Sequence, residues 1–181
     1  VSGGLFQDLM LPDFERVNFL CEGLPESIMV SASSIIDEKI GELGDFDTAV
    51  ATLKYTDGRL VVIKNSRRAA YGYDQRIEIL GSKGLLQVQN VVEDGIIKST
   101  EMGVQSSKPE YFFLERYKVA YQEEWAAFVS AVQMKEHVPV SLADGIAALA
   151  IAEAAAVSAE TSSEVCLLYT SDAADDWSSV G

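Results

Sequence analysis

The sequence contains none of the short motifs that mark a phosphate-binding loop or a catalytic metal. Its 13 glycines include no two separated by a single residue, so the G-x-G-x-x-G turn that holds a dinucleotide pyrophosphate is absent. Walker A, H-E-x-x-H, G-x-S-x-G and EF-hand patterns are missing as well. The single histidine, His137, falls between two predicted helices, and we assign it no role. We therefore expect neither cofactor-binding nor metal-binding residues in this chain.

Cysteine and basic residues are scarce. Cys21 and Cys166 lie far apart and form no C-x-x-C pair, which excludes a disulfide scaffold and a zinc site and makes a reducing cytoplasm the expected location. The 14 basic residues stand against 28 acidic ones, and the resulting charge of −14 repels phosphate backbones and anionic lipid. Nucleic acid and membrane surfaces are therefore poor partners.

No apolar run has the length of a membrane span. The most apolar stretch, residues 145–159, is interrupted by Glu153 and is shorter than the roughly 20 residues that a spanning helix needs. We expect a soluble helix there. The 181 residues have the size of one domain with a real core. Because the chain has no initiator methionine and no leader, we expect it to be part of a longer protein.

The middle of the sequence predicts a sheet. Short β-branched-rich runs separated by glycine-containing turns indicate about six strands, at residues 27–35, 46–55, 59–66, 75–80, 84–89 and 95–100. Helical spacing is found before them, over residues 13–21, and after them, over residues 114–134 and 141–160. We predict an α+β fold, with an open antiparallel or mixed sheet of about six strands and helices packed on one face.

The two later helices carry more specific signals. One face of residues 114–134 should lie on the sheet, because apolar side chains recur there at steps of three and four, namely Leu114, Tyr117, Tyr121, Trp125, Phe128, Val129 and Val132. Ser141 and Asp144 form a capping-box pair after Pro139 and predict the start of the last helix.

Residues 166–181 break the pattern of the preceding chain. The run "CLLYTSDAADD" resembles the translation of a transposon-end adapter used in sequencing libraries, so we expect residues 166–181 to be a non-native tail. A natural disordered tail is the alternative. The tail has three acids and no bases, so residues 1–165 remain strongly acidic without it.

Residues 8–20, "DLMLPDFERVNFL", place a proline among acids. If this segment is helical, Asp8, Pro12 and Glu15 share one face, while Asp13 points about 100° away from Pro12. In the simplest interpretation Pro12 is at the first helical position and the acids after it favour the helix dipole. Asp8 is less easily explained, because it follows Gly3–Gly4, a pair that lets the backbone approach another group closely.

Three stretches together resemble a known family. Residues 2–20, 40–90 and 112–132 are similar to the C-terminal domain of the glucose-fructose oxidoreductase and inositol dehydrogenase family, and "NSRRAAYGYDQR" is most similar to its inositol 2-dehydrogenase branch. The resemblance implies that residues 1–165 are a substrate-binding and oligomerising domain. It also implies a preceding Rossmann domain, absent here, with the glycine fingerprint, a catalytic lysine and most of the NAD or NADP site.

The resemblance also implies roles for residues 8 and 12. Asp8 matches the aspartate that orients a catalytic histidine, and Pro12 stands where that histidine takes the hydroxyl proton in the family. Imidazole suits this task because its pKa lies near neutrality. Proline cannot titrate, so the chain is a natural pseudoenzyme or carries a single-base change, since histidine and proline codons differ at one position. A third option is Asp8 as the base, although carboxylates with a pKa near 4 accept protons weakly at pH 7.

Substrate contacts are implied for two further residues. Tyr73 matches a substrate-contacting tyrosine, and on a strand it would share one side with Tyr71, for which packing on a neighbouring strand is the simpler role. Glu15 matches an acid that touches substrate hydroxyls, or it is a solvated acid of the first turn. Arg67 and Arg68 point to opposite faces and are left unassigned. Turn chemistry accounts for Asp45 and Asp47.

Two functions follow. The first is the C-terminal part of an NAD(P)-dependent dehydrogenase of a polyol or sugar, inactive as a fragment and homo-oligomeric, as a dimer or tetramer, through its open sheet face. The second is a non-catalytic interaction module that lost the histidine at position 12. An upstream glycine fingerprint and lysine would favour the first.

Overall fold

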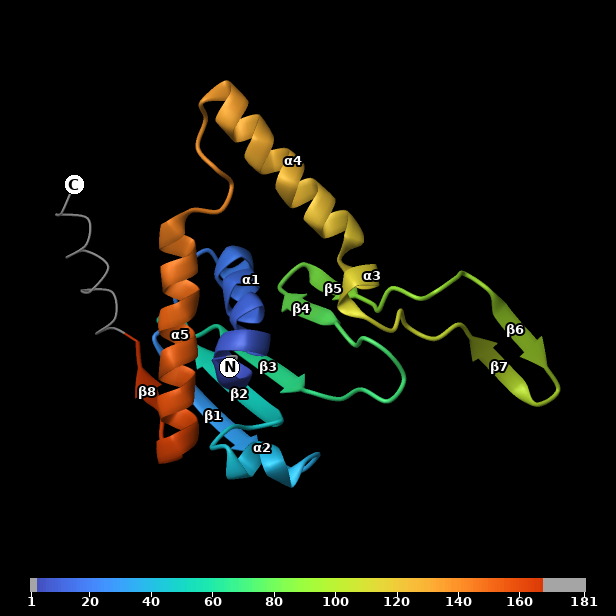
Figure 1. The fold of residues 1–181 in the computed structure, drawn as a ribbon, viewed down its shortest axis with the longest axis horizontal. Coiled ribbons are helices and arrows are strands. Elements are labelled where there is room, and N and C mark those ends of the chain that lie inside the picture. The colour runs from blue at the N-terminus through green and yellow to red at the C-terminus, as the bar shows by residue number, and fades with distance from the viewer. Residues whose placement is uncertain (1–2, 168–181) are drawn as a thin grey trace. The chain divides into compact units, whose positions relative to one another are not determined.

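The computed structural model describes residues 3–167, which form an α+β fold with two compact units (Figure 1). Of the described residues, 3–68 and 140–167 form the first unit, and 69–139 form the second. The predicted α+β class with antiparallel strands is confirmed. The strands are divided, however, between one four-stranded sheet and two separate hairpins.

The sheet of the first unit is antiparallel throughout. Its order is β3-β2-β1-β8, and its strands are β1 (Ser27–Ser33), β2 (Thr48–Lys54), β3 (Leu60–Ser66) and β8 (Val165–Cys166). Val30 of β1 pairs with Ala51 of β2, which pairs with Ile63 of β3, and all three side chains are buried. Because side chains alternate along a strand, this row marks the covered face of the sheet.

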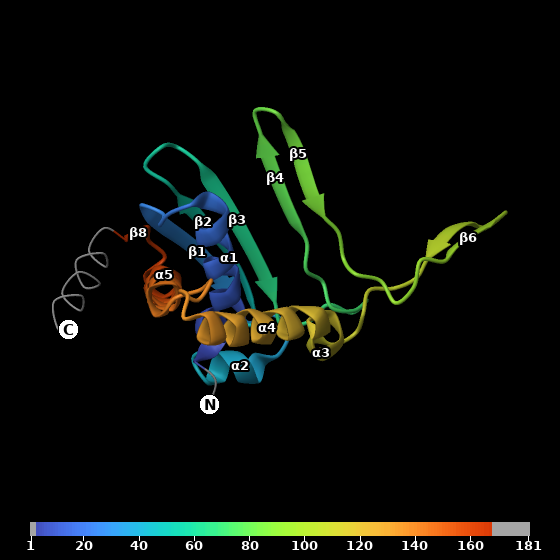
Figure 2. The same ribbon diagram turned by 90° about the horizontal axis from the view of Figure 1, so that it is seen from above.

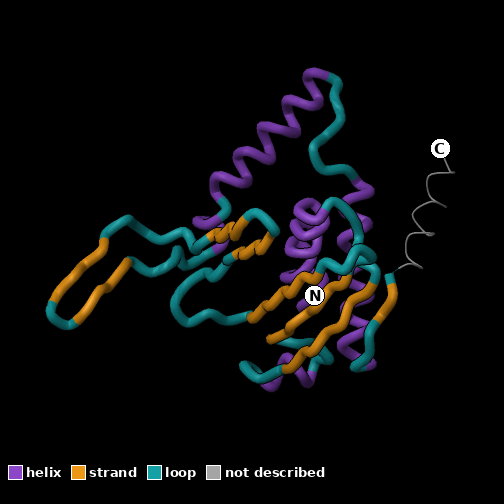
Figure 3. The backbone as a smooth tube through the Cα atoms, turned by 180° about the vertical axis from the view of Figure 1, so that it is seen from behind, coloured by secondary structure: helices purple, strands orange, loops and turns teal. Residues whose placement is uncertain are grey.

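Two helical segments cover that face. The first is a π-helix, η1 (Phe6–Met10), that continues into α1 (Leu11–Cys21), and the second is α5 (Leu142–Thr161). α5 contacts β1, η1 and α1, and in Figure 3 the strands lie in front of the helices of this unit. Met10, Phe14 and Ile151 are completely or almost completely buried in the resulting core.

The sequence signals of α5 are confirmed. The Ser141 hydroxyl accepts a hydrogen bond from the N–H of Asp144, and the Asp144 carboxylate accepts one from the N–H of Ser141 at 2.7 Å. Ser158, buried near the other end, accepts the Val30 N–H at 2.9 Å. Among the described residues, α5 alone has the length and composition of a membrane span, but core helices pass the same test, and its alanine-rich side is buried in the first unit.

Asp47 organises the connection between β1 and β2. Its buried carboxylate accepts hydrogen bonds from the backbone N–H groups of residues 35–37 and from the Thr48 hydroxyl. Burial raises the pKa of this carboxyl, but the donors outweigh burial, and the pKa lies below its ordinary value of 3.8. α2 (Glu38–Glu42) follows directly, with Asp37 as its N-cap. Asp47 thus has the turn role that the sequence predicts.

The second unit consists of two hairpins and two helices. The hairpins pair β4 (Ile77–Gly81) with β5 (Gly84–Val88), seen side by side in Figure 2, and β6 (Ile97–Thr100) with β7 (Gly103–Ser106). An isolated bridge joins Val92 and Pro109. The helices are α3 (Phe113–Arg116) and α4 (Lys118–Met134).

The predicted strands are all present, and two more exist. Strands β1 to β6 each coincide with one of the six predicted runs, and β4 extends one residue past its run, to Gly81. β7 begins with glycine and is mostly polar, and β8 has two residues, so neither carries a strand signal. β8 also crosses the predicted boundary at residue 166, because Cys166 pairs with Ser27 and Leu167 is buried. The rest of the predicted tail, 168–181, lies outside the described residues.

The helix predicted over residues 114–134 is present as α3 and α4, but its apolar face is exposed. Trp125 keeps 67% of its surface accessible, and Ala131 is the one buried residue of α4. Burial of this face against the sheet would be a contact between the two units, and it stays a prediction. Spacing predicts an amphipathic helix, but it does not specify the surface that covers it.

We predict that Asp47→Asn lowers the urea midpoint of the chain at pH 7, because an amide nitrogen would then face backbone N–H groups that now donate to a carboxylate. A carboxyl with a lowered folded-state pKa stabilises above its unfolded pKa, and this contribution is lost as the pH falls through the folded value. The difference between variant and parent should therefore shrink when the pH is lowered well below 3.8. Glu42→Gln, on the exposed helix α2, serves as the control. Equal midpoints at pH 7 would contradict the role of Asp47.

Candidate functional site

Pro12 is the second residue of α1, one position after the first helical position that the simplest interpretation of the sequence predicts. Helical backbone nevertheless precedes it, because η1 leads directly into α1. A π-helix bonds residue i to residue i+5 instead of i+4, so the α-helical ladder begins anew at Leu11. This change of ladder explains how a helical segment accommodates a proline whose ring, in a regular α-helix, clashes with the carbonyl of Asp8.

The start of this segment approaches the carboxylate of Asp45. Gly4 has a φ of 83°, and a Cβ at this position would lie 3.0 Å from Oδ1 of Asp45. The N–H of Leu5 donates to the same oxygen at 2.9 Å. The sequence indicated that Gly3–Gly4 permits a close backbone approach, and Asp45 is the group approached.

Arg67 holds the other side of Asp45. Its Nη2 donates to Oδ2 of Asp45 at 2.8 Å, and its Nε donates to the carbonyl of Phe46 at 3.2 Å. The Arg67 side chain is 23% exposed, so this pair is shielded from bulk water on most sides. The sequence placed Arg67 and Arg68 on opposite faces, with at most one of them facing the cleft, and left both unassigned.

Asp8 lies within reach of the same arginine. Its Oδ2 is 3.9 Å from Nη1 of Arg67, and 49% of its side chain is exposed. The contact is therefore a long, partly solvated ion pair, weaker than the pair of Arg67 with Asp45. The guanidinium of Arg67 thus contacts two carboxylates. One is that of Asp8, a predicted site residue, and the other is that of Asp45, which accepts the N–H of Leu5 at the start of the helical segment.

Asp13 links α1 to the sheet. Its Oδ2 accepts a hydrogen bond from Nδ2 of Asn65 on β3 at 2.9 Å, and its Oδ1 accepts one from Arg16. Asn65 was missed in the sequence, because no local pattern pairs residues 52 positions apart. Glu15, the predicted substrate contact, is half-buried on the same helix.

Tyr71 and Tyr73 are not on a strand, so the prediction that alternation places them on one side is wrong. They precede β4, and Gly72 between them has a φ of 133°. A Cβ on Gly72 would lie 2.8 Å from the carbonyl oxygen of Pro109, which excludes an ordinary strand residue there. Tyr71 is 53% exposed, and its hydroxyl donates to Asp74, which is close in sequence, so packing on a neighbouring strand is not its role either.

Tyr73 is held by neighbours within the second unit. Its N–H donates to the carbonyl of Glu110 at 2.7 Å, and its ring meets that of Tyr117 edge-on with centroids 5.7 Å apart. Asp74, beside it, has a pKa well below the ordinary value, mainly because Arg76 donates two hydrogen bonds to it. These contacts fix the backbone around Tyr73.

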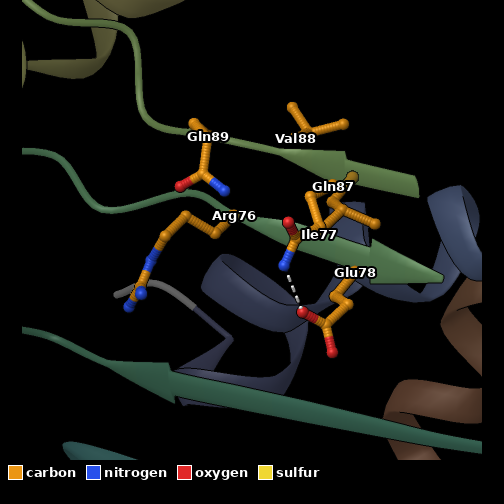
Figure 4. Close-up of a pocket in the computed structure, with 6 residues that line it drawn as sticks. All are labelled: Arg76, Ile77, Glu78, Gln87, Val88 and Gln89. Atoms are coloured by element: carbon orange, nitrogen blue, oxygen red, sulfur yellow. Dashed lines mark hydrogen bonds between the residues drawn. The ribbon is translucent and has the colours of Figure 1, made fainter. Parts of the chain in front are cut away.

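A shallow hollow of about 200 Å³ lies along β4 and β5. It is lined by Arg76, Ile77, Glu78, Gln87, Val88 and Gln89 (Figure 4). Two of the lining side chains pair with each other, since Nε2 of Gln87 donates to Oε2 of Glu78 at 2.7 Å. The hollow contains none of the predicted site residues.

The described residues also contain no metal centre, in that no three of their histidine, cysteine, aspartate or glutamate side chains are grouped to hold an ion.

The candidate site is therefore the polar face of η1 and α1. It brings Asp8, Pro12 and Asp13 together with Arg67 and Asn65 from the end of β3. Tyr73 belongs to the second unit.

In a comparison with known protein families, residues 1–167 match the family described as "Oxidoreductase family, C-terminal alpha/beta domain". The chain is 44% identical over 167 residues to myo-inositol 2-dehydrogenase of Thermotoga maritima, covering 92% of this chain and 50% of the relative. The fold matches the crystal structure of a probable dehydrogenase from Thermotoga maritima, with a TM-score of 0.89, 44% identity and coverage of 92% and 51%.

A more distant structure contains ligands. It is a myo-inositol dehydrogenase from Lactobacillus casei in complex with NAD(H) and myo-inositol, with a TM-score of 0.77 and 25% identity, and the match covers 92% of this chain and 49% of that one. The chain thus spans about half the length of the relatives that it matches.

We predict that Arg67→Met destabilises the chain by about 1 to 3 kcal/mol, because Asp45 and the Phe46 carbonyl lose charge-assisted hydrogen bonds. The amide of Leu5 should also exchange with solvent faster, since Asp45 loses the group that holds it. Urea unfolding and NMR amide exchange measure the two effects. Arg68→Met is the matched control, because Arg68 is exposed. If Arg67→Met and Arg68→Met have the same stability and the same exchange rate at Leu5, the contacts of Arg67 with Asp45 and Phe46 do not stabilise the fold.

Proposed function

Because this chain belongs to the oxidoreductase family whose C-terminal alpha/beta domain matches residues 1–167, we propose that it is the substrate-side half of an NAD(P)-dependent dehydrogenase acting on inositol or a similar polyol. The observation that carries the proposal is 44% identity to a myo-inositol 2-dehydrogenase over 92% of the chain. Residues 1–165 would bind substrate and assemble the oligomer, and a Rossmann domain would precede them. Residues 166–181 would be a non-native tail.

Nicotinamide would be bound mainly by that preceding domain. Within residues 3–167 no glycine-rich turn leads from a strand into a helix, so the described residues do not fit a dinucleotide pyrophosphate. The relative from Lactobacillus casei with bound NAD(H) and myo-inositol supports the choice of cofactor. The fragment by itself would therefore be inactive.

The residues of this chain would act on the substrate. The Glu15 carboxylate would accept hydrogen bonds from the hydroxyls of a polyol, and the Tyr73 hydroxyl would donate or accept one. Asp8 would orient a base at position 12, four residues further on, and Arg67 supports this role because it lies within 3.9 Å of the Asp8 carboxylate. Position 12 is proline, so the proton acceptor that the family uses is absent from the chain as it stands.

A non-catalytic oligomerisation module is the second candidate, and Pro12 is the observation that favours it. The proline side chain cannot accept or release a proton, so position 12 offers no group for proton transfer, while the fold around it is intact. The sequence upstream discriminates between the two candidates. A glycine fingerprint and a lysine there favour the dehydrogenase, and their loss favours the module.

The open sheet face is the proposed self-association surface. Opposite the covered side, four apolar side chains of β1 to β3 are exposed, namely Met29, Val50, Leu60 and Val62. Burying such a patch against a second copy removes apolar surface from water.

The two cysteines of the described residues are free thiols, which supports a location in the cytoplasm.

We predict that the full-length protein oxidises myo-inositol about 10² to 10⁴ times faster after Pro12→His, the usual gain from general-base catalysis. The rate is followed by the absorbance of NADH. Pro12→His combined with Asp8→Asn should lose much of the gain, because the imidazole loses its orienting carboxylate. Equal rates for the proline and histidine forms would refute the assignment of position 12, and another group would be the base.

We also predict that the full-length protein is a dimer or larger in solution, and that Val62→Lys shifts it towards the monomer. Light scattering coupled to gel filtration measures the mass. Thr56→Lys, in the turn between β2 and β3, adds the same charge outside the proposed surface. A monomeric parent protein at working concentration would rule out the open sheet face as an interface.

A further inference from the structure

Tyr117 lies at the bend between α3 and α4, within the second unit. Its N–H donates to the carbonyl of Phe113 at 2.8 Å, which fixes its backbone. Its ring meets that of Tyr73 edge-on with centroids 5.7 Å apart, and the guanidinium of Arg116 lies 5.6 Å from the centre of the same ring. The side chain of Tyr117 is therefore held against Tyr73.

The hydroxyl of Tyr117 joins two other side chains. Nε2 of Gln75 donates to it at 2.5 Å, and the Tyr73 hydroxyl donates to it at the longer distance of 3.5 Å. A phenolic oxygen has two lone pairs, so it can accept both bonds. Gln75 is itself held, because its N–H donates to Asn90, whose side chain donates to Asp74. A chain of hydrogen bonds thus leads from Asp74 to the hydroxyl of Tyr73.

The backbone of Tyr73 is fixed separately from its side chain. Its N–H donates to the carbonyl of Glu110 at 2.7 Å, and Gly72 lies against the carbonyl of Pro109. With the backbone fixed, two torsions decide where the Tyr73 hydroxyl lies. Tyr117 contacts both the ring and the hydroxyl of Tyr73, so it restricts both torsions.

We propose that Tyr117 is a positioning residue, which directs the Tyr73 hydroxyl towards a hydroxyl group of the polyol substrate. The inference rests on the proposed function, in which Tyr73 contacts the substrate. A side chain that is already oriented does not lose rotamer freedom when the ligand binds, so binding is tighter. Tyr117 needs no contact with the substrate, because its effect passes through Tyr73.

A double-mutant cycle in the full-length protein tests the proposal. Calorimetric titration with myo-inositol in the presence of NADH measures Kd without turnover. Tyr117→Phe keeps the ring and removes the hydroxyl, and it should raise Kd about 2- to 10-fold, the usual effect of one neutral hydrogen bond. Tyr73→Phe should raise Kd as well. The double variant should bind no more weakly than Tyr73→Phe alone, because the hydroxyl through which Tyr117 acts is then already absent.

Tyr121→Phe is the matched control. It removes a hydroxyl from the ring whose centroid lies 6.0 Å from that of Tyr117, and it should leave Kd unchanged. Should Tyr117→Phe fail to fold, Gln75→Met takes its place, because it removes the donor to the Tyr117 hydroxyl.

A second measurement needs no substrate. NMR three-bond couplings of Tyr73 report its first side-chain torsion, χ1. The parent protein should show the coupling of a single rotamer, and Tyr117→Phe should show an average over several. This readout separates an oriented Tyr73 from a general loss of stability.

Three results would overturn the inference. An unchanged Kd or a single χ1 rotamer in Tyr117→Phe would show that its hydroxyl does not position Tyr73. Additive losses in the double variant would show that Tyr117 acts independently of Tyr73. An equal loss in Tyr121→Phe would assign the effect to packing along α4. A parent protein that binds no myo-inositol would contradict the proposed function instead, and the couplings of Tyr73 would then decide the inference.

Discussion

The Asp45 carboxylate joins three parts of the first unit that are distant in sequence. One oxygen accepts the N–H of Leu5 at the start of the helical segment, and the other accepts Arg67 at the exit of β3. Gly4 allows this approach, because a side chain there would collide with the carboxylate. The position of η1 relative to the sheet, and with it the direction in which Asp8 and Pro12 project, depends on this junction.

Local signals in the sequence were enough to locate most elements. Alternating β-branched runs identified six strands, and Ser141 with Asp144 identified the start of α5, because these patterns arise from interactions within a few residues. Gly72 shows where such a pattern misleads. The alternation of Tyr71 and Tyr73 looked like a strand, but a close contact with the distant Pro109 sets the backbone there.

The candidate site was predictable only in part. Asp8, Pro12 and Asp13 are close in sequence, so their common helical segment was readable from the sequence. Arg67 and Asn65 were not, since each reaches an acid more than 20 positions away and hydrogen bonds of that range leave no periodic trace.

The π-helical turn before Pro12 has a consequence for how this protein evolves. In a regular helix, replacing a residue by proline costs about 3 kcal/mol or more, so selection for folding alone would remove such a change. Here the ladder has already been interrupted at Met10, and the first turn of α1 accepts proline. Folding by itself therefore opposes proline at position 12 less than it would in the interior of a regular helix. An inert ring can therefore stand at this position while the helical segment and the core beneath it keep their form.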